Sequence, residues 1–232
     1  YKRQVGDKPN NMPNWLWDFE ARPISEDDKD NLKSYERISK RGFKGSLYKT
    51  DEFINQHPFG TVPAGFVGDE HLGVFESNSI LRAVARECKD KTLYGGEDIN
   101  LKSRIDSYLD ANLVFSREFQ VYLLELEDIT KYTYERTKSA YQFYMDGLEN
   151  SLSKNNFLAG DSLSIADISF VCEFAQFLRE GHYLNQLKSK NLSLISENFQ
   201  TDYPLTFKHF KNLCNKKEFS DVMGTYLDWY KM

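Results

Sequence analysis

The spacing of apolar and polar residues changes near residue 95, from short apolar runs to long helical stripes. Before that point, residues 62–67 and 72–75 form two apolar runs around a Gly-Asp-Glu-His turn, which predicts a β-hairpin. A helix is predicted directly after the hairpin, because apolar residues recur there at helical spacing: Ile80, Leu81, Val84 and Ala85.

Two long stripes follow in the second half of the chain. Residues 100–127 and 134–152 carry apolar side chains at helical spacing, so we expect two long antiparallel helices in a bundle. Ser164 and Asp167 are spaced as the N-cap and the third residue of a capping box before an apolar helix. A further helix is predicted to begin at Tyr203-Pro204, since proline is tolerated in the first turn.

Residues 6–24 are polar and interrupted by prolines. Alternating aromatic residues at 15, 17 and 19 predict either an anchor that fixes a long loop to the core or a wall for a substrate. Ser25 is expected to cap a helix from Glu26 to Lys40, with Leu32, Tyr35 and Ile38 as its inner stripe. A short helix is expected over residues 48–56.

Composition narrows the class of protein. The chain has 232 residues, a net charge of −5 and 40% hydrophobic residues, enough for a sizeable core. No basic cluster predicts a nucleic-acid partner, and no apolar run approaches the roughly 20 residues of a membrane span. The three cysteines are far apart, and no histidine has a partner at metal-ligand spacing, so we expect cytosolic cysteine usage and no metal site.

The hairpin and the helix after it carry the chemistry expected of a ligand site. Pro63 cannot donate to a sheet, which leaves the Val62 backbone free to pair with something else. Glu76-Ser77-Asn78 begins the helix, where unpaired amides and the dipole favour a carboxylate, and Glu76 would meet an ammonium group. This pattern fits an α-amino acid head group. The alternative is ordinary N-capping by Ser77 and Asn78.

The same residues, in the same order, resemble the glutathione site of the thioredoxin-like domain in glutathione S-transferases of the cytosolic, bacterial type. The resemblance implies that the backbone of Val62, before Pro63, pairs with the cysteinyl part of glutathione. It also implies that Glu76 and Ser77 hold the γ-glutamyl group. The usual Asn-Pro-x-Gly-Lys-Val-Pro pattern is altered here: His57 replaces the Asn, and Thr61 replaces a Lys that commonly holds the glycyl carboxylate.

The resemblance covers about residues 46–223 and implies two domains. The first, residues 1–88, is an α/β thioredoxin-like domain with an insertion at about 6–45, and the second, residues 97–232, is an all-α helical bundle. The strand-like run at Tyr1–Val5 would be the second strand of the family fold. The first strand, the first helix and the residue that activates the thiol would then lie upstream, so the catalytic residue is unknown.

An electrophile pocket is expected on the first long helix. In the family, that part of the helix faces the glutathione site, and by resemblance the candidates are Tyr108, Asn112 and Phe115. Aromatic stripes on helices are also typical of a buried core, which is the alternative for these side chains.

Taken with the resemblance, the sequence predicts a cytoplasmic, homodimeric transferase with a role in detoxification. Glutathione is its co-substrate, and a small electrophilic molecule is its second substrate. One alternative is a non-catalytic binding or regulatory module with the same fold. A second alternative is a glutathione-dependent lyase, dehalogenase or ether-cleaving enzyme, which shares the site and differs in the electrophile.

Overall fold

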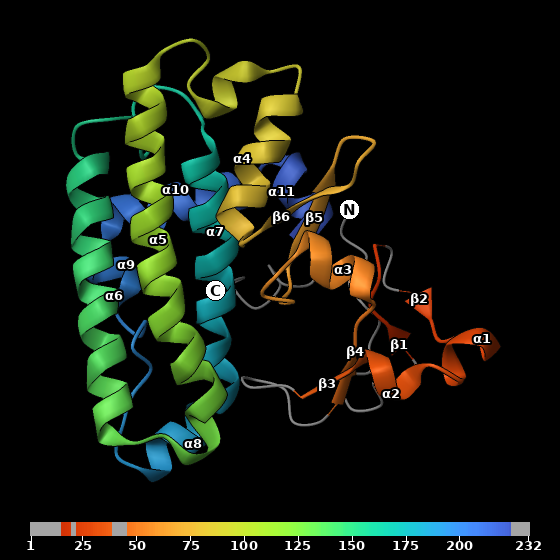
Figure 1. Ribbon diagram of the computed structural model, residues 1–232. Coiled ribbons are helices and arrows are strands. Elements are labelled where there is room, and N and C mark those ends of the chain that lie inside the picture. Colours follow the sequence, from red (N-terminus) through yellow and green to blue (C-terminus); the bar gives the residue numbers. More distant parts are fainter. Residues whose placement is uncertain (1–14, 20–21, 39–45, 224–232) are drawn as a thin grey trace. The chain divides into compact units, whose positions relative to one another are not determined.

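The computed structural model describes residues 15–19, 22–38 and 46–223 (Figure 1). Contacts divide the chain into two compact units, residues 1–83 and 84–232, and each is considered by itself. The sequence-based expectation for Tyr1–Val5 lies outside the described residues.

The first elements that the structure describes in the N-terminal unit are strands, in a region where the sequence predicted none. β1 (Trp15–Leu16) pairs antiparallel with β2 (Arg22–Pro23), and β3 (Glu36–Ile38) pairs antiparallel with β4 (Ser46–Tyr48). A parallel bridge joins Trp17 to Lys49, directly after β4. The alternating aromatic segment therefore runs beside the strand that leads into the next helix. Leu16, between two of these aromatic residues, is fully buried.

The expected continuous helix from Glu26 to Lys40 is wrong. It begins as predicted, because Ser25 and Asp28 form a capping box, but α1 (Glu26–Lys29) ends after one turn. Asp30 and Asn31 follow, and both residue types favour local side-chain bonds over helix. α2 (Leu32–Tyr35) is equally short, and the chain then turns into β3, where Ile38 is 82% exposed and not part of an inner stripe.

The helix, hairpin and helix predicted for residues 48–87 are confirmed. α3 (Asp51–Gln56) starts three residues later than expected, because Thr50 caps it and residues 46–48 belong to β4. β5 (Ala64–Val67) and β6 (Leu72–Phe75) form the antiparallel hairpin, and α4 (Ser77–Glu87) follows at once. The predicted stripe of α4 is wrong at Val84, which is 55% exposed, whereas Ala85 is buried.

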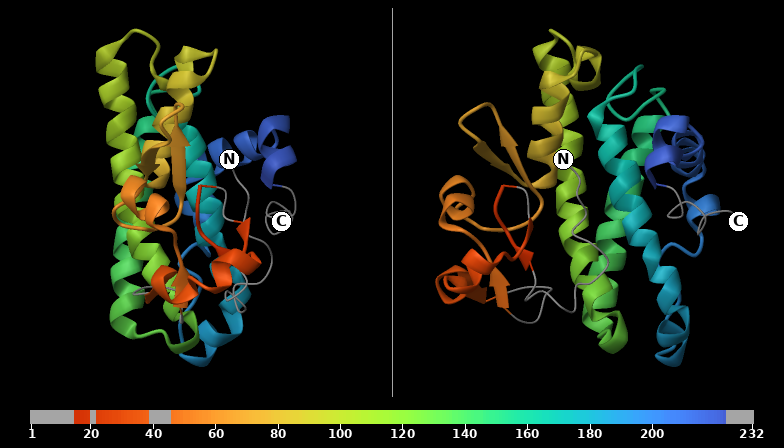
Figure 2. Two further views of the ribbon diagram at one scale, coloured as in Figure 1. Left: turned by 45° about the vertical axis from the view of Figure 1, so that its right-hand side comes forward. Right: turned by 90° about the vertical axis from the view of Figure 1, so that its right-hand side faces the viewer.

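The described secondary structure of the C-terminal unit is helical, apart from an isolated bridge between Phe157 and Gly160. The predicted long helices are α5 (Ile99–Glu125) and α6 (Lys131–Leu152), joined by a short connection, and Figure 2 shows them with α7 as neighbouring long helices. The remaining helices are α7 (Ile165–Phe177), α8 (Leu184–Ser189), α9 (Phe199–Asp202), α10 (Pro204–Cys214) and α11 (Lys217–Met223). Pro204 is in the first turn of α10, as predicted.

Aromatic side chains fill the core between α5, α6 and α7. Phe115 stacks on Tyr144 with ring centroids 4.9 Å apart, and its edge meets Phe177 at 5.4 Å. Tyr141 stacks on Phe177 at 5.5 Å. Large rings in offset and edge-to-face contact bury much apolar surface, so this cluster explains why the three helices pack together.

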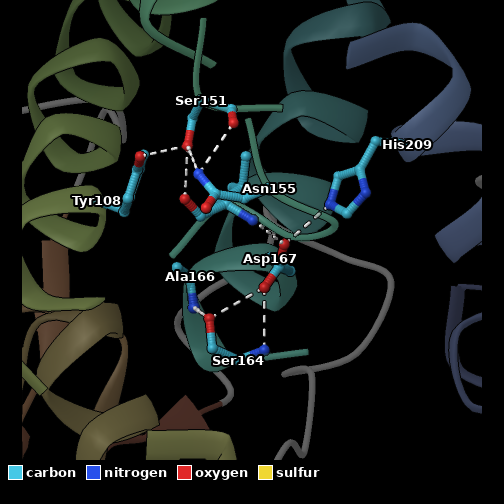
Figure 3. Close-up of polar contacts among 8 residues, drawn as sticks. Tyr108, Ser151, Asn155, Ser164, Ala166, Asp167 and His209 are labelled. Atoms are coloured by element: carbon cyan, nitrogen blue, oxygen red, sulfur yellow. Dashed lines mark hydrogen bonds and ion pairs between the residues drawn. The ribbon is translucent and has the colours of Figure 1, made fainter. Parts of the chain in front are cut away.

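The capping box at the start of α7 is confirmed, and its carboxylate has further partners (Figure 3). Asp167 is fully buried and accepts hydrogen bonds from the amide and hydroxyl of Ser164 at 2.9 and 3.0 Å. It also accepts from the Leu158 amide at 3.0 Å, and His209 Nε2 on α10 lies 2.9 Å away. A buried carboxylate with this many donors holds a loop and two helices together.

Candidate functional site

The hairpin register brings the two predicted halves of the ligand site together. Ala64 lies opposite Phe75, and Gly65 lies opposite Val74, in the β5–β6 hairpin, whose two strands are labelled in Figure 1. The ladder ends at the Ala64–Phe75 pair, and Val62 and Ser77 each lie two residues beyond that pair along the chain. Opposed residues in an antiparallel pair have Cα atoms about 4.5–5.5 Å apart. The Val62 backbone and the start of α4 are therefore close neighbours at one end of the hairpin.

The Val62 side of the site is accessible. Val62 is 58% exposed, and the Val62–Pro63 peptide bond is cis. Because β5 begins only at Ala64, Val62 precedes the hydrogen-bonded ladder. A peptide-like ligand that runs alongside this residue has an open backbone to approach.

The opposite side is the junction of β6 and α4. Glu76 has a φ of 65°, a left-handed backbone that is uncommon for a residue with a side chain and that gathers at ligand sites. The Ile80 amide donates to the Glu76 carbonyl at 3.0 Å, so the amide groups of the residues before it have no acceptor inside the helix. Glu76 and Ser77 are half-buried, whereas Asn78 is only 6% exposed.

A positively charged side chain that was not predicted from the sequence lies next to this site. Lys49 Nζ, at the end of β4, donates to the carbonyl oxygen of Gly60, two residues before Val62. Burial lowers the pKa of Lys49, and the charge of Arg37 adds to that effect. Gly60 has a φ of 57° and is buried, and this left-handed conformation favours glycine. Lys49 is 13 residues from Val62 in sequence, so only the fold reveals that the two lie close together.

His57 is a buried packing residue with one open nitrogen. It is 0% exposed and stacks on Phe75 with ring centroids 4.7 Å apart. Its Nε2 lies 3.4 Å from Thr61 Oγ1, and its Nδ1 has no partner among the described residues. Burial, and next the charge of Lys49, lowers the pKa of the imidazole. Thr61, which stands in place of the usual Lys, is thus linked to His57.

The three electrophile-pocket candidates are all on α5 and contact α6 and α7. Phe115 is 1% exposed within the aromatic core, and Asn112 donates to Ser169 Oγ at 2.6 Å. The Tyr108 hydroxyl donates to Ser151 Oγ at 2.6 Å (Figure 3). These contacts fit the alternative that the three side chains belong to a buried core. Their role in an electrophile pocket stays a prediction.

The described residues were also considered for metal binding and for membrane-spanning helices. Within the described ranges, no group of three or more His, Cys, Asp or Glu side chains is arranged to hold a metal ion. Among the helices that the structure describes, none is long and apolar enough to cross a membrane.

Comparisons with known proteins agree with the fold. Residues 120–217 match the family model of the glutathione S-transferase C-terminal domain. The structure resembles Ure2p5 from Phanerochaete chrysosporium cocrystallized with 1-(S-glutathionyl)-2,4-dinitrobenzene, with a TM-score of 0.61 and 19% identity, covering 79% of this chain and 84% of that one. These findings confirm the predicted superfamily, that of the glutathione S-transferases, and the predicted fold class, a thioredoxin-like α/β domain followed by an all-α domain.

The curated proteins that are similar in sequence are named elongation factor 1-gamma, not glutathione S-transferase. Elongation factor 1-gamma 1 of Oryza sativa subsp. japonica is 29% identical over 198 residues, which are 81% of this chain and 42% of the elongation factor. Elongation factor 1-gamma of Artemia salina is 26% identical over 192 residues, or 82% of this chain and 40% of the elongation factor. The chain thus spans about two fifths of the length of these relatives.

Proposed function

We propose that the chain binds glutathione at the end of the β5–β6 hairpin, near which both Val62 and Ser77 lie. Glutathione has a peptide core between an α-amino acid head group at one end and a glycyl carboxylate at the other. The observation that carries the proposal is the register of Ala64 with Phe75, because it brings the segment before β5 and the start of α4 to the same end of the hairpin. This spacing suits one peptide-like ligand that contacts both.

The γ-glutamyl head group is assigned to the start of α4. Its carboxylate would accept from the amide and hydroxyl of Ser77, where the helix dipole adds favourable charge. Its ammonium would face the Glu76 carboxylate. The left-handed backbone of Glu76 supports this assignment, because it turns the chain sharply just before the first helical amide.

The glycyl carboxylate is assigned to Lys49. Family members commonly use a Lys at the position of Thr61, and Thr61 cannot supply a charge. Lys49 is near the same loop, since its ammonium contacts the Gly60 carbonyl. A carboxylate there would gain a charge-assisted hydrogen bond.

The activity that we propose is transfer of glutathione to an electrophile. The cysteinyl thiol loses its proton to solvent, and the thiolate attacks an electrophilic carbon, because the thiolate is the reactive form. With 1-chloro-2,4-dinitrobenzene, a carbon–sulfur bond forms, the carbon–chlorine bond breaks and chloride leaves. The likeness to a protein cocrystallized with the product of this reaction supports this choice of test substrate.

The second candidate is a binding module without turnover, within an elongation factor. The observation that favours it is the name shared by the relatives from rice and from Artemia salina. Both candidates use the same ligand site and differ in whether the bound thiol reacts. The homodimer, the cytoplasmic location and the role in detoxification belong to the first candidate and are proposed with it.

Titration calorimetry with glutathione tests the site, and cysteinylglycine, which lacks the γ-glutamyl group, is the matched control ligand. We expect glutathione to bind with a Kd below about 1 mM, a range usual for enzyme substrates, and cysteinylglycine to bind far more weakly. Equal binding of both ligands, or no binding of glutathione, would refute the assignment. A conjugation assay with 1-chloro-2,4-dinitrobenzene then separates the candidates: turnover supports the transferase, and binding without turnover supports the module.

A further inference from the structure

The side chain of His57 contacts the neighbour of each segment that the proposed glutathione site joins. Its ring stacks on Phe75, the last residue of β6, with ring centroids 4.7 Å apart, and Glu76 follows directly. Its Nε2 lies 3.4 Å from Thr61 Oγ1, and Thr61 directly precedes Val62. One side chain therefore ties the loop before β5 to the strand that leads into α4.

The backbone of His57 holds the same loop. Its amide donates to the Phe53 carbonyl at 2.8 Å, at the end of α3, and its carbonyl accepts from the Gly60 amide at 2.8 Å. Gly60 has a φ of 57°, which turns the chain sharply. Residues 57–60 thus form a tight turn that is bonded at both ends, and Thr61 and Val62 leave it in a fixed direction.

The end of α3 packs directly against β6, next to the His57 ring. A Cβ on Gly73 would lie 1.8 Å from the Gln56 carbonyl oxygen, so the two backbones are in contact at this place. The ring centroids of His57 and Phe53 are 5.6 Å apart, and His57 is 0% exposed. A ring enclosed in this way does not touch a ligand, and it acts on the site through its neighbours.

The surroundings of the His57 ring favour its neutral form. Burial lowers the pKa of the imidazole, the charge of Lys49 adds to that effect, and the charge of Glu76 acts weakly in the opposite direction. Nδ1 has no hydrogen-bond partner among the described residues. A neutral ring that carries its proton on Nε2 donates to Thr61 Oγ1, whereas an imidazolium would bury a second N–H without an acceptor. The contact with Thr61 is therefore available at neutral pH.

We propose that His57 is a positioning residue for glutathione, which sets the Val62 backbone relative to the start of α4. The inference rests on the proposed glutathione site. A ligand that contacts both segments binds best when their spacing is fixed beforehand, because less conformational entropy is then lost on binding. A ligand that contacts the start of α4 alone does not depend on that spacing.

NMR titration of the full chain with two ligands tests the proposal. Glutathione spans both segments, whereas γ-glutamylethylamide carries the same head group without the cysteinylglycine part. Thr61→Val removes a hydroxyl at an exposed position, and His57→Phe keeps a ring against Phe53 and Phe75. In both variants we expect roughly threefold to tenfold weaker glutathione binding and unchanged γ-glutamylethylamide binding. The double variant should bind glutathione no more weakly than the weaker single variant, because both substitutions remove the same hydrogen bond.

Thr201→Val is the control, since it removes an exposed hydroxyl that bonds only to the nearby Asn198 and Asp202 in the C-terminal unit. This variant should bind glutathione as tightly as the wild type. If the wild type binds glutathione and the His57 and Thr61 variants bind it equally well, the inference is wrong and the proposed function stands. Parallel loss of both ligands, or additive losses in the double variant, also overturns the inference. A wild type that does not bind glutathione refutes the proposed function and the inference with it.

Discussion

His209 Nε2 lies 2.9 Å from Asp167 Oδ1, and this contact joins α10 to the start of α7. The sequence reading assigned Asp167 to a local capping box and found no partner for His209. In the structure the two are one unit, because the oxygen that faces His209 also accepts from the Leu158 amide at 3.0 Å. The cap of a single helix thereby becomes a link between three segments of the C-terminal unit.

Replacing Asp167 should therefore cost more than the loss of an ordinary helix cap. We expect Asp167→Ala to lower the free energy of unfolding by about 2 to 4 kcal/mol, since it removes a cap and leaves several buried donors without an acceptor. Urea denaturation measures this loss. Asp161→Ala is the control, because Asp161 is exposed in the same loop and should change stability by less than about 0.5 kcal/mol. Equal losses in the two variants would show that the network adds nothing.

Ser77→Ala should weaken glutathione binding by about 1 to 3 kcal/mol, because a hydrogen bond to a charged carboxylate is lost. Calorimetric titration gives the change in affinity directly. Ser139→Ala is the control, because it removes an exposed hydroxyl on α6 that bonds only within its own helix. This variant should bind glutathione as tightly as the wild type. An unchanged Kd in Ser77→Ala would remove Ser77 from the proposed site.

Glu180 predicts a dependence of stability on pH. Burial raises its pKa above the ordinary value of 4.5, although four hydrogen bonds act in the opposite direction. A carboxyl group with a raised pKa contributes most stability when it is protonated in both folded and unfolded states. This contribution is then lost as the pH rises from about 4.5 through the folded-state pKa.

The comparison with Glu180→Gln isolates this effect, because glutamine does not titrate. We expect the difference in free energy of unfolding, wild type minus variant, to decrease as the pH rises above 4.5. Urea denaturation at a series of pH values measures it. A difference that increases with pH would mean that the hydrogen bonds outweigh burial and that the pKa is lowered.

Gly73 should not tolerate a side chain. A Cβ at this position in β6 would collide with the backbone carbonyl of Gln56 at the end of α3, and backbone atoms cannot rotate away. We expect Gly73→Ala to lower the free energy of unfolding of the N-terminal unit by about 1 to 3 kcal/mol. Thermal unfolding followed by circular dichroism measures the change. Gly65→Ala is the control, since Gly65 is in the paired strand β5, its φ is not in the left-handed region, and its Cβ would meet Ile80 at 3.4 Å, an ordinary contact. Only the excess of Gly73→Ala over this control reports the collision.

Elements with strong local signals were predictable from the sequence. The turn at 68–71 and its flanking apolar runs specify the hairpin, and the Ser164–Asp167 spacing specifies the start of α7. Pro204 likewise marks the first turn of α10. In each case the information lies within a few residues, which is the range over which propensity and capping act.

The predictions that were wrong concern residues whose structure is decided by pairing with distant segments. Residues 36–38 continue a helical pattern in the sequence, but they pair with Ser46–Tyr48 as β3, and this long-range partner overrides a weak local preference. In the candidate site, the Val62–Ser77 neighbourhood follows from the hairpin alone. The position of Lys49 does not, because it depends on how β4 lies against the Gly60 loop. The role of Glu180 was not predictable either, because its partners, Tyr122 and the Ile195 and Ser196 amides, come from distant segments.

The two ends of the β5–β6 hairpin differ in their proposed roles. One end carries Val62 and Ser77, and the other is the turn of residues 68–71, whose four residues are all exposed. Since the ladder between them holds the first end, additions at the tip should leave the proposed ligand contacts at the first end unchanged. The tip is thus a natural insertion point for an epitope or a label.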